Sequence, residues 1–249
     1  MSNKIVLITG ASRGIGAATA RLFAANGYAV GINYRSRQDA AQAVQRDIEA
    51  QGGRCVLIQA DVSVESEVIN LFRQLDEQLG APDCLVNNAG ILHAQSKLEA
   101  MSAERINQLL SSNVTSAFIC AREAIKRMST AHGGSGGSII NVSSMAALKG
   151  SPNEYIDYAA SKGAIDSMTR GLALEVAAYG IRVNAVRPGL IYTDIHADGG
   201  EPGRVDRLKE KIPLRRGGQP EEVAEAICWL ASEKSAFVTG SFIDLSGGL

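Results

Sequence analysis

The chain has 249 residues, and 25 Lys and Arg against 26 Asp and Glu leave a formal net charge of -1. This length fits a single α/β domain with a substantial core, and the scattered cations form no basic stripe, which argues against nucleic acid as a partner. No apolar run is long enough to span a bilayer and the first strand begins almost at the N-terminus, so we expect no membrane association, no cleaved signal and a cytoplasmic protein.

Cysteine and histidine give no pattern of a metal site or a disulfide framework. The four cysteines lie far apart in the sequence and none forms a C-x-x-C pair, while the three histidines lack a paired metal spacing. We therefore expect the cysteines to be buried small hydrophobic residues, and we expect no metal.

The first predicted element is a strand that leads through a glycine turn into a helix. Ile5–Ile8 is an apolar run, as expected of a strand that is buried on both faces. Thr9–Gly16 turns the chain, and helix-forming residues follow from Ile15 to a stop at Asn26. This order is that of the first half of a dinucleotide-binding βαβ unit.

The glycines of the turn, Gly10, Gly14 and Gly16, have a G-x-x-x-G-x-G spacing. We expect one to permit the tight turn, another to let the backbone approach a pyrophosphate, and the last to let the helix pack on the strand. The helix N-terminus would offer the phosphates free N–H groups and a partial positive charge. A plain tight turn would also use glycine, so the neighbouring motifs decide between the two readings.

Strands and helices alternate along the rest of the chain. This alternation predicts a doubly wound Rossmann α/β fold, with a parallel sheet and helices on both faces, in one domain over residues 1–249. The further predicted strands are Tyr28–Asn33, Arg54–Gln59, Asp83–Asn87, Ser138–Val142, Ile181–Arg187 and Ser241–Leu245. The further predicted helices are Arg37–Ala50, a helix that ends at Leu79, Ala103–Met128, Asn153–Ala178 and Pro220–Ser232. Residues 190–218 are irregular and polar, which is typical of a mobile lid over a site.

The end of the second strand predicts which dinucleotide is bound. A protein selective for NAD usually places Asp or Glu there to bind the ribose 2′-OH, but residues 33–37 read Asn-Tyr-Arg-Ser-Arg. Arg35 can hold a 2′-phosphate, and Arg13 of the glycine turn can reach the same corner. We therefore predict NADP(H). The alternative is that Arg35 and Arg37 are ordinary solvated charges.

Tyr158 and Lys162 lie four residues apart on a predicted helix, so their side chains share a face. A phenol has an ordinary pKa of about 10, too high for proton transfer at neutral pH, and a nearby cation favours the phenolate. We expect the ammonium of Lys162, together with an oxidised nicotinamide, to lower the pKa of Tyr158. Tyr155 has no such partner, and we expect it to pack or to form a loop hydrogen bond.

Polar residues stand at the ends of two further strands. The fifth strand ends at Ser143 and Ser144, where a hydroxyl can donate to a substrate carbonyl oxygen, and residues 87–90 close the fourth strand at the same edge. Asn113 sits inside a predicted helix although Asn is a mediocre helix former. We expect a local break there that frees backbone groups for water.

Taken together, these motifs resemble the short-chain dehydrogenase/reductase family in its compact single-domain form. The resemblance covers nearly the whole chain, with the motifs in the right order. They are the turn at residues 9–16, Asp61-Val62, residues 87–90, Asn113, Ser144, Tyr158 with Lys162, and Pro188-Gly189.

The resemblance implies a seven-stranded Rossmann sheet and an enzyme that moves a hydride between NADP(H) and a small-molecule carbonyl or secondary alcohol. It implies Tyr158 as general acid/base, Lys162 as the group that lowers its pKa and holds the nicotinamide ribose, and Ser144 as the donor to the substrate oxygen. Asn113 would hold a relay water. The implied cofactor-binding residues are Gly10, Ser12, Arg13, Gly14, Ile15, Gly16, Arg35, Asp61, Val62, Asn88, Ala89, Gly90, Tyr158, Lys162, Pro188, Gly189, Ile191 and Thr193. The C-terminal residues from Thr239 are similar to a tail used in tetramer contacts, which implies a homotetramer.

Two departures leave alternatives open. Many members place the catalytic serine thirteen residues before the tyrosine, but here Ser144 precedes it by fourteen and Ser143 by fifteen, so either serine could act. Acyl-carrier-protein reductases use an arginine to dock their carrier, and Leu174 stands in its place, which argues against that function without excluding it. A non-catalytic NADP(H)-binding sensor is a further alternative, although such proteins tend to lose the tyrosine or the lysine.

The substrate is not identified by the sequence. Residues 190–216 and those near His93, Met145 and Tyr192 are expected to line the pocket, and their mixed character fits sugars, small ketones and quinones alike. We expect His93 and His196 to belong to the pocket wall or the surface rather than to carry protons.

Overall fold

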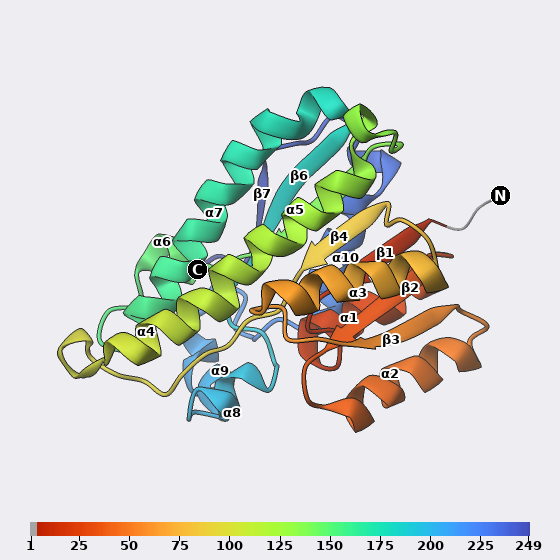
Figure 1. The fold of residues 1–249 in the computed structure, drawn as a ribbon. Coiled ribbons are helices and arrows are strands. Elements are labelled where there is room, and N and C mark those ends of the chain that lie inside the picture. The colour runs from red at the N-terminus through yellow and green to blue at the C-terminus, as the bar shows by residue number, and fades with distance from the viewer. Residues whose placement is uncertain (1–3) are drawn as a thin grey trace.

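A computed structural model describes residues 4–249. Within them, seven parallel strands form one sheet in the order β3-β2-β1-β4-β5-β6-β7 (Figure 1). Each predicted strand is confirmed, with ends that differ by at most one residue. The strands are β1 (Ile5–Ile8), β2 (Ala29–Tyr34), β3 (Cys55–Gln59), β4 (Cys84–Asn87), β5 (Gly137–Val142), β6 (Ile181–Pro188) and β7 (Phe242–Leu245).

The helices connect the strands and cover the sheet. They are α1 (Gly14–Ala25), α2 (Gln38–Ala50), α3 (Glu65–Gln78), α4 (Ala103–Leu110), α5 (Ser116–Met128), α6 (Ala146–Lys149), α7 (Ile156–Val176), α8 (Ile195–Asp198), α9 (Arg204–Leu208) and α10 (Pro220–Ala231).

One prediction about the helices is confirmed and two were wrong in detail. The predicted helix over 103–128 is divided into α4 and α5 by a π-helical turn at Ser111–Thr115, which is the local break expected at Asn113. The predicted helix over 153–178 is shorter at both ends. Asn153 has a left-handed backbone with φ of 65°, and Ala177–Tyr179 form a 3-10 turn. Residues 190–218 contain α8 and α9, although the sequence there lacks a sustained helical pattern.

The residues of β1 show why the sheet is buried on both faces. Val6 and Ile8 belong to a cluster with apolar residues of α1, α2 and α10, while Leu7 belongs to a second cluster with residues of α3, α5 and α7. All three strand residues are fully buried. Because neighbouring side chains on a strand point to opposite faces, an apolar run of this kind requires helices on both sides.

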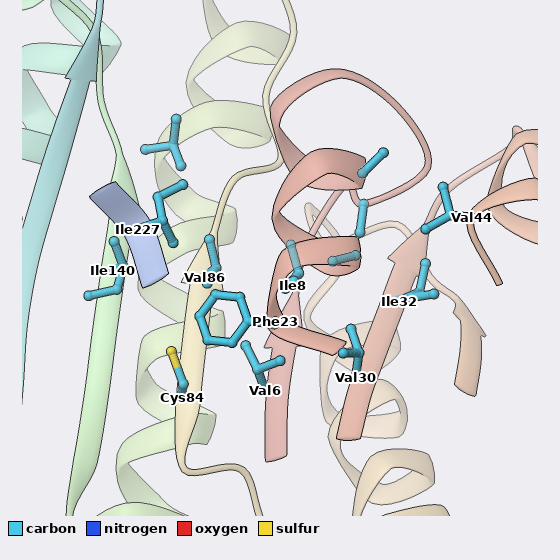
Figure 2. Packing of buried hydrophobic residues seen from close by; sticks show 14 of the residues in the cluster. Val6, Ile8, Phe23, Val30, Ile32, Val44, Cys84, Val86, Ile140 and Ile227 are labelled. Carbon is cyan, nitrogen blue, oxygen red and sulfur yellow. The ribbon is translucent and has the colours of Figure 1, made fainter. Parts of the chain in front are cut away.

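The first cluster is centred on Phe23 of α1. Figure 2 shows its ring over β1 and β4, among Val6, Cys84 and Val86. The ring is 1% exposed and meets Tyr28 edge-on, with ring centroids 4.9 Å apart. This packing fixes α1, and with it the glycine turn, against the sheet.

The order of the strands creates a crevice. The chain runs outward from β1 through β2 to β3 and then returns to β4 on the other side of β1. The loops that follow β1 and β4 therefore diverge, and the space between them at the carboxyl ends of the strands is where doubly wound sheets bind ligands. Figure 1 shows α8 and α9 on the side of the molecule where the carboxyl ends of the strands lie.

Residues 4–249 include neither a membrane-spanning helix nor a cluster of metal ligands. No helix among them is both long and apolar enough to cross a membrane. No group of three or more His, Cys, Asp or Glu in this part of the chain could hold a metal ion.

Candidate functional site

A cavity of about 770 Å³ opens at the carboxyl edge of the sheet. Its wall is formed by the segments that follow β1, β2, β3, β4, β5 and β6, by the start of α7 and by residues of α8 and α9. Every site residue predicted from the sequence lines this cavity except Gly16 and Asn113. The fold therefore brings the glycine turn and the Ser/Tyr/Lys set into one space.

Gly16 and Asn113 lie behind the cavity wall. A Cβ at Gly16 would lie 2.6 Å from the carbonyl oxygen of Gly10, so glycine allows α1 to begin close against the turn. The side chain of Asn113 accepts a hydrogen bond from the N–H of Ile91 at 2.7 Å and donates to the Ile91 carbonyl at 3.0 Å. It also donates to Ser161 Oγ at 3.3 Å. The side-chain amide thus fastens the segment after β4, and a relay water at this residue would have to be held by its backbone.

The turn after β1 fits a pyrophosphate. Gly10 has a φ of 63°, and a Cβ there would lie 3.0 Å from the Cα of Ala89, so a larger residue would be both strained and crowded. No side chain hydrogen-bonds to the N-terminus of α1 at its N-cap, Arg13. The first N–H groups of α1 are therefore available to an anion in the cavity, where the helix dipole favours negative charge.

Asn33 braces this turn, a role that the sequence analysis missed. It is 2% exposed, its Oδ1 accepts from the N–H of Gly10 at 3.2 Å, and its Nδ2 donates to the carbonyls of Ile58 and Ala60 at 3.3 and 3.1 Å. The signal was present in the sequence, since Asn33 is a polar residue inside an otherwise apolar strand. A buried amide in such a place needs partners and therefore connects the loops around it.

Three guanidinium groups gather at the corner of the cavity next to the end of β2. Arg13, Arg35 and Arg37 all line it, and the described residues that follow β2 directly include no acid. Arg35 Nη1 lies 3.7 Å from Asp61 Oδ2, and Arg13 forms an ion pair with Asp198. The corner is therefore rich in donors that suit a phosphate group.

Tyr158 is half-buried and Lys162 is buried, both at the start of α7. Lys162 Nζ donates to the carbonyl oxygen of Val142 at 2.8 Å and lies 5.6 Å from the centroid of the Tyr158 ring. Burial raises the pKa of Tyr158 to about 12, and a hydrogen bond with Ser144 opposes this rise. Burial lowers the pKa of Lys162 to about 8, and the nearby Asp166 carboxylate opposes that fall.

The sequence analysis expected the pKa of Tyr158 to be lowered by Lys162 together with an oxidised nicotinamide. In the structure burial disfavours the charged form of both side chains, so the pKa of Tyr158 is raised although Lys162 lies nearby. A second positive charge beside the ring would be needed to favour the phenolate.

The two candidate serines have different environments. Ser143 is 2% exposed, and its hydroxyl donates to Asp166 Oδ1 at 2.6 Å. Asp166 in turn accepts from Arg187 Nε at 2.9 Å. Ser144 is partly exposed to the cavity and hydrogen-bonds with Tyr158. Ser144 is thus the hydroxyl that a substrate oxygen can reach.

The start of α7 is fixed by an ion pair that the sequence analysis missed. Asp157 Oδ1 accepts from the backbone N–H of Tyr158 at 2.9 Å, and its Oδ2 accepts from Arg105 Nε at 2.8 Å. Arg105 Nη1 donates to the carbonyl of Ala94 at 2.8 Å. Asp157 therefore connects the backbone at Tyr158 to the loop after β4.

The remaining wall is mixed in character. Tyr155 is 4% exposed and its hydroxyl donates to the carbonyl of Gly199 at 3.4 Å, which is the loop hydrogen bond expected of it. His93 and His196 line the cavity, and burial lowers the pKa of His196. The ring of His196 donates through Nε2 to the carbonyl of Ile191 at 3.0 Å, so it is held as a neutral wall residue. Tyr192 does not line this cavity, since its hydroxyl donates to Asp206 at 3.0 Å.

Comparisons with known proteins give matches over nearly the whole chain. A family model described as Enoyl-(Acyl carrier protein) reductase matches residues 10–249. The chain is 60% identical over 244 residues to Uncharacterized oxidoreductase YgfF of Escherichia coli, covering 98% of this chain and 99% of that protein. It is 36% identical over 247 residues to 3-oxoacyl-(acyl-carrier-protein) reductase FabG of Staphylococcus epidermidis, covering 99% of each. The solved structure of a short-chain dehydrogenase/reductase from Serratia marcescens matches with a TM-score of 0.90 at 31% identity, covering 98% of this chain and 97% of that one.

Replacing Lys162 by Met tests its burial through the pH dependence of stability. The folded protein gives up the Lys162 proton near pH 8, whereas the unfolded chain keeps it up to the ordinary pKa of 10.5. The unfolded state therefore binds more protons between these values, and Lys162 adds stability as the pH rises through this window. From pH 7 to pH 9.5 we expect the free energy of unfolding of the wild type to rise by about 2 kcal/mol relative to that of Lys162→Met, measured by urea denaturation.

The matched control is Lys149→Met, which removes an exposed lysine from the rim of the cavity. Its free energy of unfolding should follow the wild type across the same pH range. A constant difference between the wild type and Lys162→Met would show that the ammonium is hydrated in the folded protein.

Proposed function

The chain belongs to the short-chain dehydrogenase/reductase family, and from that premise we propose that it is an NADP(H)-dependent enzyme that interconverts a carbonyl and a secondary alcohol. Membership makes it an oxidoreductase of a family that uses nicotinamide cofactors. The finer proposal depends on one observation, namely that Ser144, Tyr158 and Lys162 line the same cavity as the glycine turn.

The preference for NADP(H) is supported by the charges at the end of β2. A carboxylate there would bind the ribose 2′-OH of NAD and repel a 2′-phosphate. This chain instead presents Arg35 and Arg37 after the strand, with Arg13 across the same corner. Guanidinium groups bind phosphate through charge-assisted hydrogen bonds, which favours the phosphorylated dinucleotide.

The residues of the chain can position and protonate the substrate oxygen. A bound nicotinamide would supply or accept the hydride at the substrate carbon. Tyr158 would give a proton to the oxygen as the carbonyl is reduced, and Ser144 would donate a hydrogen bond to the same oxygen. A phenol with a raised pKa stays protonated at neutral pH, which is the form required in the reducing direction.

Two other functions were considered from the sequence. A carrier-protein reductase would need an arginine where this chain has Leu174. The Leu174 side chain is 85% exposed and has no charge with which to bind an acidic partner. A non-catalytic sensor would not need the Ser144, Tyr158 and Lys162 set, which is complete here. The homotetramer, the cytoplasmic location, the single domain and the mobility of residues 190–218 stay predictions from the sequence.

Arg35→Ala tests the cofactor preference. We expect the wild type to bind NADPH more tightly than NADH, and the variant to lose about tenfold or more in NADPH affinity, because a hydrogen bond to a charged group is removed. Fluorescence titration of both cofactors measures this, with Arg21→Ala as the control, since Arg21 pairs with Asp47 outside the cavity. Tighter binding of NADH by the wild type would contradict the proposal.

Tyr158→Phe tests the proton transfer. The variant keeps the ring but loses the acid, so we expect turnover to fall by at least about 10²-fold while the Kd of NADPH stays close to that of the wild type. A panel of aldehydes, ketones and alcohols, followed by nicotinamide absorbance, supplies the assay. Tyr179→Phe is the control, because Tyr179 is exposed and lies outside the cavity. Undiminished turnover in Tyr158→Phe would remove Tyr158 from this role.

A pair of serine variants tests which hydroxyl serves the substrate. We expect Ser144→Ala to lower kcat by about 10²-fold or more, as for the loss of one donor to a developing oxyanion. Ser143→Ala should instead destabilise the fold by about 1 to 3 kcal/mol, because it removes a buried partner of Asp166. Steady-state kinetics and urea denaturation on both variants separate these effects, and the reverse pattern would assign the substrate to Ser143.

A further inference from the structure

The carboxylate of Asp198 lies at the corner of the cavity where the arginines gather. It is the last residue of α8, and it forms an ion pair with Arg13 Nη2. Its other oxygen, Oδ1, lies 3.8 Å from Arg37 Nη2. Arg13 and Arg37 are the N-cap residues of α1 and α2, so one carboxylate from the segment after β6 lies between the starts of two helices.

The Asp198 carboxylate is a hydrogen-bond partner for only some of the donors of Arg13 and Arg37. Arg13 Nη1 is buried and has no hydrogen-bond partner, and Oδ2 of Asp194 lies 3.7 Å away from it. The 3.8 Å separation between Arg37 and Asp198 is also too long for a hydrogen bond. Buried donors without partners are rare in folded proteins, and Arg13, which carries this one, lines the cavity.

A phosphate matches this corner better than the carboxylate does. It carries more negative charge and three acceptor oxygens, whereas a carboxylate has two, so it can engage donors of both arginines at once. The remaining guanidinium group at the corner, Arg35, lies 3.7 Å from Asp61, which also carries a carboxylate. The negative groups that face the corner are thus Asp61, Asp194 and Asp198.

We propose that Asp198 is a specificity-determining residue whose carboxylate competes with the 2′-phosphate of the dinucleotide for Arg13 and Arg37. This proposal rests on the NADP(H) preference proposed above. A dinucleotide without the 2′-phosphate leaves the ion pair between α8 and α1 in place. A dinucleotide with the phosphate breaks it, so the position of α8 depends on which cofactor is bound.

Loss of the ion pair between Asp198 and Arg13 would also affect other residues of the cavity wall. Two other residues close to Asp198 in the chain, Thr193 and His196, line the same space. Because they share a short segment with Asp198, releasing its carboxylate from Arg13 would free them to move as well. In this way the 2′-phosphate would act on the wall that meets the substrate.

Asp198→Asn tests the competition with ligands that lack the nicotinamide. The variant keeps the shape of the side chain and removes its charge. We expect it to bind adenosine 2′,5′-bisphosphate about three- to fivefold more tightly than the wild type does, within the range that a partly exposed ion pair allows. Its Kd for 5′-AMP, which lacks only the 2′-phosphate, should stay within about twofold. Isothermal titration calorimetry at one fixed ionic strength measures both.

Two controls isolate the contact. Asp47→Asn removes the carboxylate that pairs with Arg21 at 2.7 Å outside the cavity, and it should change neither Kd. In an Arg13→Ala background, Asp198→Asn should give a smaller gain for the bisphosphate, because the arginine for which the carboxylate competes is missing.

The outcomes separate this inference from the proposed function. If the wild type prefers the bisphosphate and Asp198→Asn changes nothing, the competition is disproved and the NADP(H) preference stands. An equal gain for both ligands would also disprove it, since that would show a general effect on access. If the wild type shows no preference but Asp198→Asn creates one, the competition is supported and the NADP(H) preference of the wild type fails.

Discussion

The site depends on the hydrogen bonds that join the loop after β1 to the loop after β4. Thr9 Oγ1 accepts hydrogen bonds from the backbone N–H groups of Asn88 and Ala89, each at 3.0 Å. Asn88 Nδ2 returns bonds to the carbonyls of Thr9 and Gly10 at 2.9 and 3.1 Å. A crevice at the point where strand order reverses has few backbone partners of its own, so side chains must supply them. These hydrogen bonds therefore hold the glycine turn at a fixed distance from the loop after β4, which lines the same cavity.

A second network of polar side chains connects β4 and β5 to α7. Asn87 donates to Asn141 at 3.0 Å, and Asn141 donates to Thr169 at 2.9 Å, all three being buried. Burying amides is costly unless each finds a partner in a defined geometry, so a network of this kind holds β4, β5 and α7 in a single arrangement. Because α7 carries Tyr158 and Lys162, the same bonds that satisfy the interior also aim the reactive side chains.

The sequence predicted what periodicity and local chemistry determine. Apolar runs such as Ile5–Ile8 need no distant information to be recognised as buried strands, and Tyr158 and Lys162 share a face on any helix. The roles of Ser143 and Asp198 could not be predicted in this way. The hydroxyl of Ser143 is engaged by Asp166, twenty-three residues away in the chain, and Asp198 meets Arg13 across 185 residues. Such pairings depend on the tertiary fold, and no local pattern announces them.

The pKa of Tyr158 shows what burial adds to an electrostatic argument made from residue types alone. A phenol beside an ammonium suggests a lowered pKa, but the same sheet edge that brings the two together also removes water from both. Desolvation acts on each charge separately, whereas their attraction requires both to be charged at once. Burial also lowers the pKa of Lys162 to about 8, and its ammonium donates to the carbonyl oxygen of Val142. Burial therefore keeps the phenol of Tyr158 protonated at neutral pH, and under the proposed function a further positive charge beside the ring would be needed to favour the phenolate.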